Sequence, residues 1–204
     1  KLGTDYFLNE KNTLGFLFKG YSNDYVGIQN SDMKISKIGS PVIDSSIMAI
    51  SDHTGNRLNY NFNLNYRFDD GNGVMWNMDA DYGMFLNDNE NYNPNLIIAG
   101  ESGEGNDTLS REYFRTVAPT DIDIYTFKVD HERPFLNGQF STGLKFSLVR
   151  TDNDFKFYNI DVETGEEVPD VDRTNRFLYE ENVNAAYANY ARQLGKFGFQ
   201  VGLR

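Results

Sequence analysis

The sequence predicts an all-β fold, an antiparallel meander of about eight long amphipathic strands of the kind that forms part of an outer-membrane β-barrel. The clearest observation lies in residues 57–68, where every even position from Leu58 to Phe68 is large and apolar and every odd position from Asn59 to Arg67 is polar. A period of two places successive side chains on opposite faces of a strand. The run is about twelve residues long, and a tilted strand needs about 9–11 residues to cross a bilayer.

A second strand of the same kind follows a short turn. The turn is Asp69-Asp70-Gly71-Asn72-Gly73, a composition typical of hairpins. Beyond it, apolar side chains share the even positions from Trp76 to Leu86, and Asn77, Asp79, Asp81 and Gly83 share the odd positions. Two long amphipathic strands around a short turn predict a hairpin of membrane-barrel type.

Short polar turns recur along the rest of the chain, at Asn9–Asn12, Asp69–Gly73, Pro134–Gly138 and Leu194–Lys196. Alternating segments flank these turns, with apolar side chains at Leu14, Phe16, Phe18, Tyr125, Phe127, Val129, Phe140, Leu144, Phe146, Leu148, Val183, Ala185, Tyr187, Phe197, Phe199, Val201 and Leu203. The pattern therefore predicts four hairpins. Residues 180–194 contain alanines that favour a helix, but we favour a strand there because apolar residues interleave with asparagine and a turn follows directly.

Long polar connections separate the hairpins, at roughly residues 24–52, 87–119 and 152–174, and part of each is expected to extend the adjacent strands. Outer-membrane barrels alternate short periplasmic turns with long external loops in this way. A soluble β-sandwich would show turn signals about every 8–12 residues. The spacing therefore favours the barrel.

Composition excludes several classes of protein. The 204 residues are enough for one domain, and they include 16 Phe and 13 Tyr, which suit an apolar sheet face and membrane interfaces. No apolar run approaches the roughly eighteen residues of a transmembrane helix. The net charge of −11 argues against nucleic acid as a partner, and the absence of cysteine excludes disulfides and thiol chemistry.

Both ends of the chain break off within alternating patterns. Lys1 begins directly in a strand-like segment with no signal peptide before it, and the final residues, 198–204, alternate as well. We therefore expect residues 1–204 to be a single β-barrel segment of a larger chain, with neither plug domain nor signal peptide in the segment.

Candidate chemistry is sparse. Asp79 and Asp81 share the polar side of one strand, where paired carboxylates can act as acid and base, although barrel interiors more often pair such groups with neighbours such as Arg67, Lys128 and Lys145. The sequence therefore predicts no catalytic, cofactor-binding or metal-binding residue, and it does not identify the residues that bind a ligand.

Four other features are weaker still. His53 and His131 are too far apart in sequence to suggest a metal cluster, and His131 is expected near a membrane rim. The acidic run at residues 87–95 lacks the glycine and glutamate of a calcium loop, which leaves at most a weak surface cation site. Residues 100–103 do not fit a nucleophile elbow, and residues 106–108 match a glycosylation sequon that is common by chance.

Several segments resemble one family. The segment Trp76–Tyr82 resembles the "LDADY" strand of Bacteroides-type TonB-dependent outer-membrane receptors, and similar likenesses occur at Asp121–Asp130, Gly143–Phe146 with Thr151–Phe155, Glu181–Tyr190 and Gly198–Arg204. The resemblance implies a barrel of about 22 strands with an N-terminal plug, which imports scarce nutrients with energy delivered through TonB. The plug, the TonB-contacting box and the C-terminal aromatic strand have no counterpart in this chain, so no energy-coupling residue can be assigned here.

The leading expectation is therefore the barrel portion of a nutrient receptor in the outer membrane of a Gram-negative cell, and not an enzyme. Its expected partners are outer-membrane lipid, an unknown nutrient and, in the full-length protein, the plug domain and the TonB energy-coupling complex. Two alternatives remain, a small outer-membrane barrel enzyme with Asp79 and Asp81 in the lumen and a soluble β-sandwich module for binding or adhesion.

Overall fold

The computed structural model describes residues 1–101 and 108–204, and within them it is all-β, with 81% strand and no helix, as predicted. The described residues contain no helix that is long and apolar enough to cross a membrane. The strands are β1 (Leu2–Asn9), β2 (Asn12–Ile35), β3 (Ser45–Asp69), β4 (Met75–Ala99), β5 (Thr108–Val117), β6 (Thr120–Phe135), β7 (Gly138–Ile160), β8 (Glu167–Pro169), β9 (Asn175–Leu194) and β10 (Phe197–Leu203).

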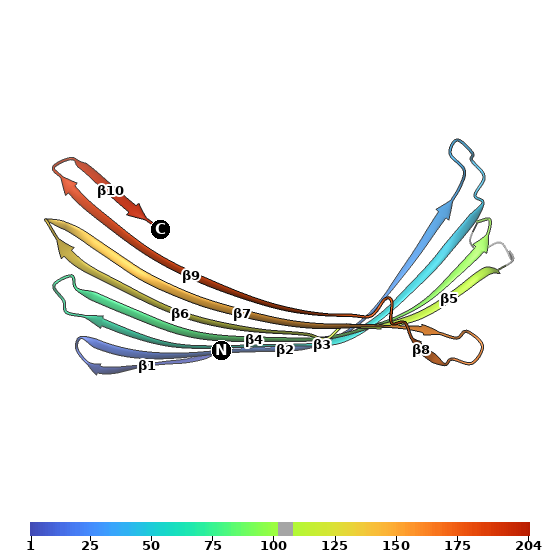
Figure 1. The fold of residues 1–204 in the computed structure, drawn as a ribbon, viewed down its shortest axis with the longest axis horizontal. Helices are drawn as coiled ribbons and strands as arrows, with labels where there is room; N and C mark the ends of the chain where they lie inside the picture. Colours follow the sequence, from blue (N-terminus) through green and yellow to red (C-terminus); the bar gives the residue numbers. More distant parts are fainter. Residues whose placement is uncertain (102–107) are drawn as a thin grey trace.

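All ten strands form one antiparallel sheet, and eight of them follow one another across it in the order β1-β2-β3-β4-β5-β7-β9-β10. Figure 1 shows the strands running side by side, with the sheet bent and twisted along its length. The strand β1 pairs with β2 and β10 pairs with β9, and the two do not pair with each other. The described sheet therefore has two open edges.

The strands β5 and β6 lie in line and act as one interrupted strand. Both sit between β4 and β7, with β6 on residues 75–87 of β4 and β5 on residues 90–98. Pro119 interrupts them because it has no backbone N–H to donate. Pairing nevertheless continues, since Ala118 N donates to Asn89 O (2.8 Å) and Asp154 N donates to Pro119 O (3.2 Å). The predicted count of about eight strands is confirmed once β5 and β6 are taken together and the three-residue β8 is left out.

The strands extend further into the polar connections than their composition suggested. The strands β3 and β4 each have 25 residues, and the segment from Asn87 to Asn95 lies inside β4. This segment begins the polar connection that was expected to extend the adjacent strands in part. Asparagine and aspartate have low strand propensity, but propensity in sheets depends strongly on context. Here residues 87–92 pair with β3 on one side, and residues 90–95 pair with β5 on the other. Pairing has therefore overridden composition.

All four predicted short turns are present, and they gather at one end of the sheet, which we call the turn end (Figure 1). The turn between β6 and β7 consists of Leu136 and Asn137, with φ of 48° and 60°. Two successive positive φ values are those of a type I′ turn, which matches the twist of the flanking strands. The longer connections, including residues 36–44 and 161–166, lie at the opposite end, the loop end.

The sheet has one apolar and one polar face over the half near the turn end. Phe62 lies opposite Tyr82, and Tyr60 lies opposite Met84, so the even positions of β3 and β4 share the apolar face, as predicted. Aromatic rings cross this face from strand to strand, with ring centroids 5.0 Å apart for Phe18 and Phe62, 6.2 Å for Phe62 and Tyr82, and 4.9 Å for Tyr82 and Tyr125.

The predicted faces of β9 are wrong. Val183, Ala185 and Tyr187 had been assigned to the apolar face, but they lie opposite Ser147, Lys145 and Gly143 of β7, which belong to the polar face. The residues of β9 on the apolar face are instead smaller or more polar, namely Asn182, Asn184, Ala186, Ala188 and Tyr190. Asn189 lies on the same face as Val183, so both faces of β9 carry alanine, tyrosine and asparagine, and alternation alone could not distinguish them.

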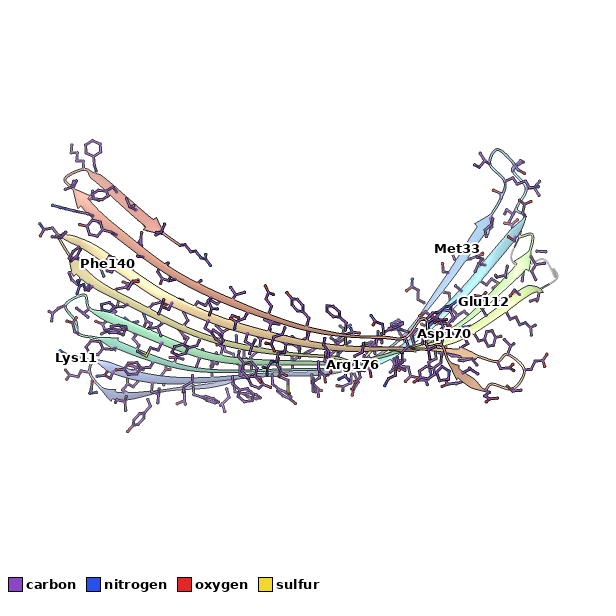
Figure 2. The ribbon with its side chains drawn as sticks, viewed as in Figure 1. Lys11, Met33, Glu112, Phe140, Asp170 and Arg176 are labelled. Carbon is purple, nitrogen blue, oxygen red and sulfur yellow. The ribbon has the colours of Figure 1, made fainter. Side chains whose placement is uncertain are left out.

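The sheet is a single layer with almost no enclosed core. Among the described residues, Ile98 and Phe157 are the buried apolar side chains, and side chains project from both faces along the sheet (Figure 2). The accessible surface is 14007 Å², where a globular protein of this mass exposes roughly 9,700 Å². The described residues form no second sheet, which removes the β-sandwich alternative.

Candidate functional site

The polar face near the turn end carries a ladder of side-chain amides. Asn61 Nδ2 donates to Asn59 Oδ1 at 2.6 Å, and Asn65 Nδ2 donates to Asn63 Oδ1 at 2.9 Å, so each bond joins residues two apart on one strand. Asn63 Nδ2 also donates to Asp81 Oδ1 on β4 at 2.7 Å. The ladder satisfies polar groups that the sequence had placed on one face.

The amides of the ladder lie flat along the sheet. A Cβ atom on Gly15 of β2 would come within 2.7 Å of Asn65 Nδ2, which is closer than non-bonded atoms approach. Glycine at this position therefore leaves room for the Asn65 side chain to cover the neighbouring strand, and a larger residue would displace that amide.

The two aspartates have different neighbours. Asp81 accepts the hydrogen bond from Asn63, while Asp79 lies directly opposite Lys128 of β6. The strand register therefore places Asp79 next to Lys128, as the sequence predicted. The remaining predicted cation, Arg67, is paired with Asp69 at 3.0 Å instead.

A charged cluster forms where β6, β7 and β9 meet on the polar face. Lys128 is paired with Asp130, and the Tyr187 hydroxyl donates to the same carboxylate across β7. Gly143 lies between them, and a Cβ there would come within 2.7 Å of the Tyr187 ring. Lys145 lies directly opposite Lys128, which places a second cation beside the first.

This cluster borders a hollow of about 440 Å³ whose lining includes Lys128, Lys145, Tyr187 and Asn189. Sequence reasoning identified the two lysines as possible partners of the aspartates but missed Tyr187, because its parity in β9 was misassigned. The hydrogen bond from Tyr187 to Asp130 joins β9 to β6 across β7, and alternation along a single strand carries no information about such a pair.

A second cluster lies further towards the loop end on the same face. The Arg57 guanidinium stacks over the Tyr25 ring, 4.6 Å from its centroid, and Arg57 Nε donates to Asn87 Oδ1 at 3.2 Å. His53 lies beside Tyr25, with ring centroids 6.4 Å apart. The stacking and the hydrogen bond together hold the Arg57 side chain against the polar face.

The other predicted features do not assemble into a site. His131 is far from His53 in the fold, on the apolar face, where it stacks on Trp76 with ring centroids 4.0 Å apart. Within the described residues, no group of three or more His, Asp or Glu side chains is placed to hold a metal ion. Residues 102 and 103 of the 100–103 segment, and Asn106 and Asp107 of the sequon, lie outside the described residues.

Comparison with known families decides what the two faces are. Residues 66–204 match the model of an outer membrane protein beta-barrel family. The chain belongs to this family. No curated protein matches the chain.

Membership of the outer membrane beta-barrel family places the chain in the cell outer membrane. In such barrels the apolar face contacts lipid, the polar face lines the lumen, short turns face the periplasm and long loops face outside. The amide ladder, the Lys128 cluster and Arg57 are therefore lumen-facing. Trp76 and His131 lie near the periplasmic turns on the lipid side, which agrees with the predicted rim position of His131.

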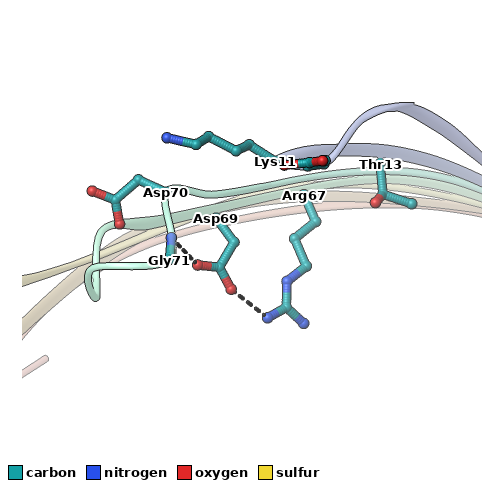
Figure 3. Close-up of a pocket in the computed structure, with 7 residues that line it drawn as sticks. Lys11, Thr13, Arg67, Asp69, Asp70 and Gly71 are labelled. Carbon is teal, nitrogen blue, oxygen red and sulfur yellow. Dashed lines mark hydrogen bonds and ion pairs between the residues drawn. The ribbon is translucent and has the colours of Figure 1, made fainter.

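The periplasmic end of this barrel wall carries a polar hollow of about 450 Å³ (Figure 3), lined by Glu10, Lys11, Thr13, Arg67, Asp69, Asp70 and Gly71. In the turn, Asp70 Oδ1 accepts from Asn72 N at 2.7 Å and from Val74 N at 2.9 Å. These backbone hydrogen bonds hold the pKa of Asp70 below its usual value. The periplasmic end of the sheet therefore carries a charged turn that is held by hydrogen bonds to the Asp70 carboxylate.

Proposed function

We propose that this chain forms part of the barrel wall of a TonB-dependent receptor that takes up a nutrient across the outer membrane, and that it does not act as an enzyme. The observation that carries the proposal is the open sheet. Eight strands lie side by side, yet the edge strands β1 and β10 do not pair with each other. Eight strands suffice for a narrow barrel whose side chains fill the interior, whereas plugged transporters use about 22.

The length of the strands supports the same proposal. The strands β3 and β4 have 25 residues each, more than twice the roughly 9–11 that a bilayer requires. The excess continues the wall beyond the membrane at the loop end, where the Arg57 cluster lies on the lumen side. A tall vestibule of this kind suits a receptor that captures its ligand outside the cell before transport.

The chemistry of the lumen-facing surface also supports the proposal, because it suits contact with a second folded domain. The asparagine ladder is flat and rich in donors and acceptors, which suits packing against the polar surface of a plug domain. Asp81 is already engaged by Asn63, which favours a structural role for this carboxylate over acid–base catalysis. The proposed partners are the plug, the TonB complex at the periplasmic end, and outer-membrane lipid.

Site-specific photocrosslinking tests the proposal. A photoreactive amino acid at Asn63, in the protein produced in its own outer membrane, should crosslink to a plug segment of the same polypeptide inside the lumen. The same group at Phe62, on the adjacent lipid-facing position, should crosslink to lipid. Adducts are identified by mass spectrometry. An Asn63 probe that reacts only with water would contradict a plugged lumen and favour an open channel or a small barrel enzyme.

A further inference from the structure

Two of the short turns contain the dipeptide Asn-Gly. Asn72-Gly73 lies in the turn between β3 and β4, and Asn137-Gly138 lies at the turn between β6 and β7. Both turns lie at the turn end of the sheet (Figure 1), and both asparagines are exposed. Exposure of the asparagine therefore does not distinguish the two sites.

This dipeptide has a reactivity of its own. The backbone nitrogen of the glycine can attack the side-chain carbonyl carbon of the asparagine, because glycine has no Cβ to obstruct the approach. The new bond joins the glycine nitrogen to Cγ, the bond from Cγ to Nδ2 breaks, and the proton of the glycine N–H leaves with Nδ2 as ammonia. Water then opens the succinimide ring at either carbonyl, which gives aspartate or isoaspartate without oxidation or reduction.

The glycine nitrogen must be free to lose its proton, and the turn between β6 and β7 prevents this. Leu136 and Asn137 form a type I′ turn, and Gly138 pairs with Phe135 at the start of the ladder. In such a turn the N–H of the fourth residue donates to the carbonyl oxygen of the first. Attack on Asn137 therefore requires the hydrogen bond that closes the turn to break.

The turn between β3 and β4 leaves its glycine nitrogen free. Asn72 N and Val74 N donate to Asp70 Oδ1, at 2.7 and 2.9 Å, and Asp70 N donates to Val74 O at 3.1 Å. Among the described residues, Gly73 N has no acceptor. The Asn72 side chain makes a long contact from Nδ2 to Asp70 O, at 3.4 Å, which is weak. Both reacting groups of this dipeptide are therefore available.

The fold also requires glycine after Asn72. Gly73 has φ of 94°, a conformation that residues with a side chain rarely adopt. A Cβ at this position would also come within 3.0 Å of Pro134 Cγ in the neighbouring turn. The reactive dipeptide is therefore set by the geometry of the turn.

We propose that Asn72 is a site of spontaneous deamidation at the periplasmic end of the barrel wall, and that the type I′ turn protects Asn137. The reaction places a further carboxylate beside Asp69 and Asp70. In the isoaspartate product the main chain runs through the former side chain, and the additional atom disturbs the hydrogen bonds to Asp70. The proposal concerns this turn alone and is independent of the transport function proposed above.

Peptide mapping of the full-length protein in isolated outer membranes tests the site. After incubation at mildly alkaline pH, mass spectrometry with electron-based fragmentation measures aspartate and isoaspartate at both positions. Asn72 should convert about tenfold faster than Asn137, the factor that corresponds to one backbone hydrogen bond. In protein that is denatured in urea before incubation, the two asparagines should convert at similar rates, because glycine follows both.

Asn72→Gln is the matched variant. It keeps the backbone donor to Asp70 but would have to form a larger ring, so position 72 should stay unmodified while Asn137 keeps its rate. Hydrogen exchange at the Val74 amide should become faster as the wild type ages and stay constant in Asn72→Gln. Equal rates at Asn72 and Asn137 in the folded protein would overturn the proposal, and so would a difference that persists in urea.

Discussion

At the scale of single residues, the face that a side chain occupies matters more than its identity. Phe62 and Asn63 are adjacent in sequence, but the register sends the first towards lipid beside Tyr82 and the second towards the lumen beside Asp81. Lipid offers no hydrogen bonds, whereas the lumen already contains amides and carboxylates. The same substitution should therefore have different consequences at these two positions.

Arginine substitutions measure this difference. On the lipid side, arginine costs about 2–4 kcal/mol near the bilayer midplane and less towards the interfaces. Phe62→Arg should therefore reduce folding stability in lipid far more than Asn63→Arg, which places a cation beside Asp81. Urea titration in lipid vesicles, followed by tryptophan fluorescence, measures both variants. Equal losses would show that the faces are assigned incorrectly.

Asp70 makes the periplasmic turn sensitive to acid. Its pKa lies below the usual value because Asn72 N and Val74 N donate to its carboxylate. A group with a depressed folded pKa stabilises the structure above its unfolded pKa, and the contribution is lost as the pH falls through the folded value. The turn should therefore be ordered at neutral pH and loosen below about pH 4.

Amide hydrogen exchange at Asn72 and Val74 tests this behaviour. Protection at these two amides should fall as the pH drops below about 4, after correction for the intrinsic pH dependence of exchange. Asp70→Asn keeps an acceptor oxygen but cannot titrate, and it should show weaker protection that does not change over the same range. A pH-independent wild type would rule out the carboxylate as the cause.

At the scale of elements, the sequence predicts strands well where the two faces differ strongly in polarity. In β3 every even position from Leu58 to Phe68 is apolar and every odd position from Asn59 to Arg67 is polar. The pairing register places these two sets on opposite faces of the sheet. In β9 both faces mix alanine, tyrosine and asparagine, so only pairing with β7 decides the parity. Strand ends were also missed, because pairing with β3 and β5 holds the asparagine-rich part of β4 extended.

The candidate site shows the same limit. The amide ladder and Asp79 were predictable because they alternate along single strands. The link between Tyr187 and Asp130 was not, because it spans β7 and depends on Gly143 leaving room. Contacts between strands that are distant in sequence are set by register, which local patterns do not encode.

The β6–β7 turn contains an avoidable strain. Leu136 has φ of 48°, and a left-handed conformation costs a residue with a bulky side chain roughly 1–2 kcal/mol. Asparagine tolerates this conformation better. Leu136→Asn should therefore stabilise the protein by up to about 1 kcal/mol, and the β-branched Leu136→Ile should destabilise it by a similar amount. Denaturant titration of the three proteins in the same detergent gives the order, and the reverse order would contradict a type I′ turn.

At the scale of the whole molecule, the two open edges dominate. Among the described strands, β1 pairs with β2 alone and β10 pairs with β9 alone. Unpaired backbone groups at a sheet edge are costly in lipid and favour pairing with further strands. If the chain is part of a wider wall, as proposed above, the chain in isolation is expected to pair its two edges with other copies of itself.

Cysteine crosslinking of the edges distinguishes a wall from a closed barrel of eight strands. The chain has no cysteine, so Tyr6→Cys in β1 and Val201→Cys in β10 can be combined without background thiols. Both positions lie on the lipid-facing side.

If the chain closes on itself, oxidation joins β1 to β10 within one molecule. If it is part of a wider wall, oxidation of the chain folded in detergent joins different molecules, and the ladder of products grows with protein concentration. We expect the intermolecular products and no stable ion conductance in planar bilayers. A predominant intramolecular disulfide would instead support the small barrel and remove the main argument for a receptor of about 22 strands.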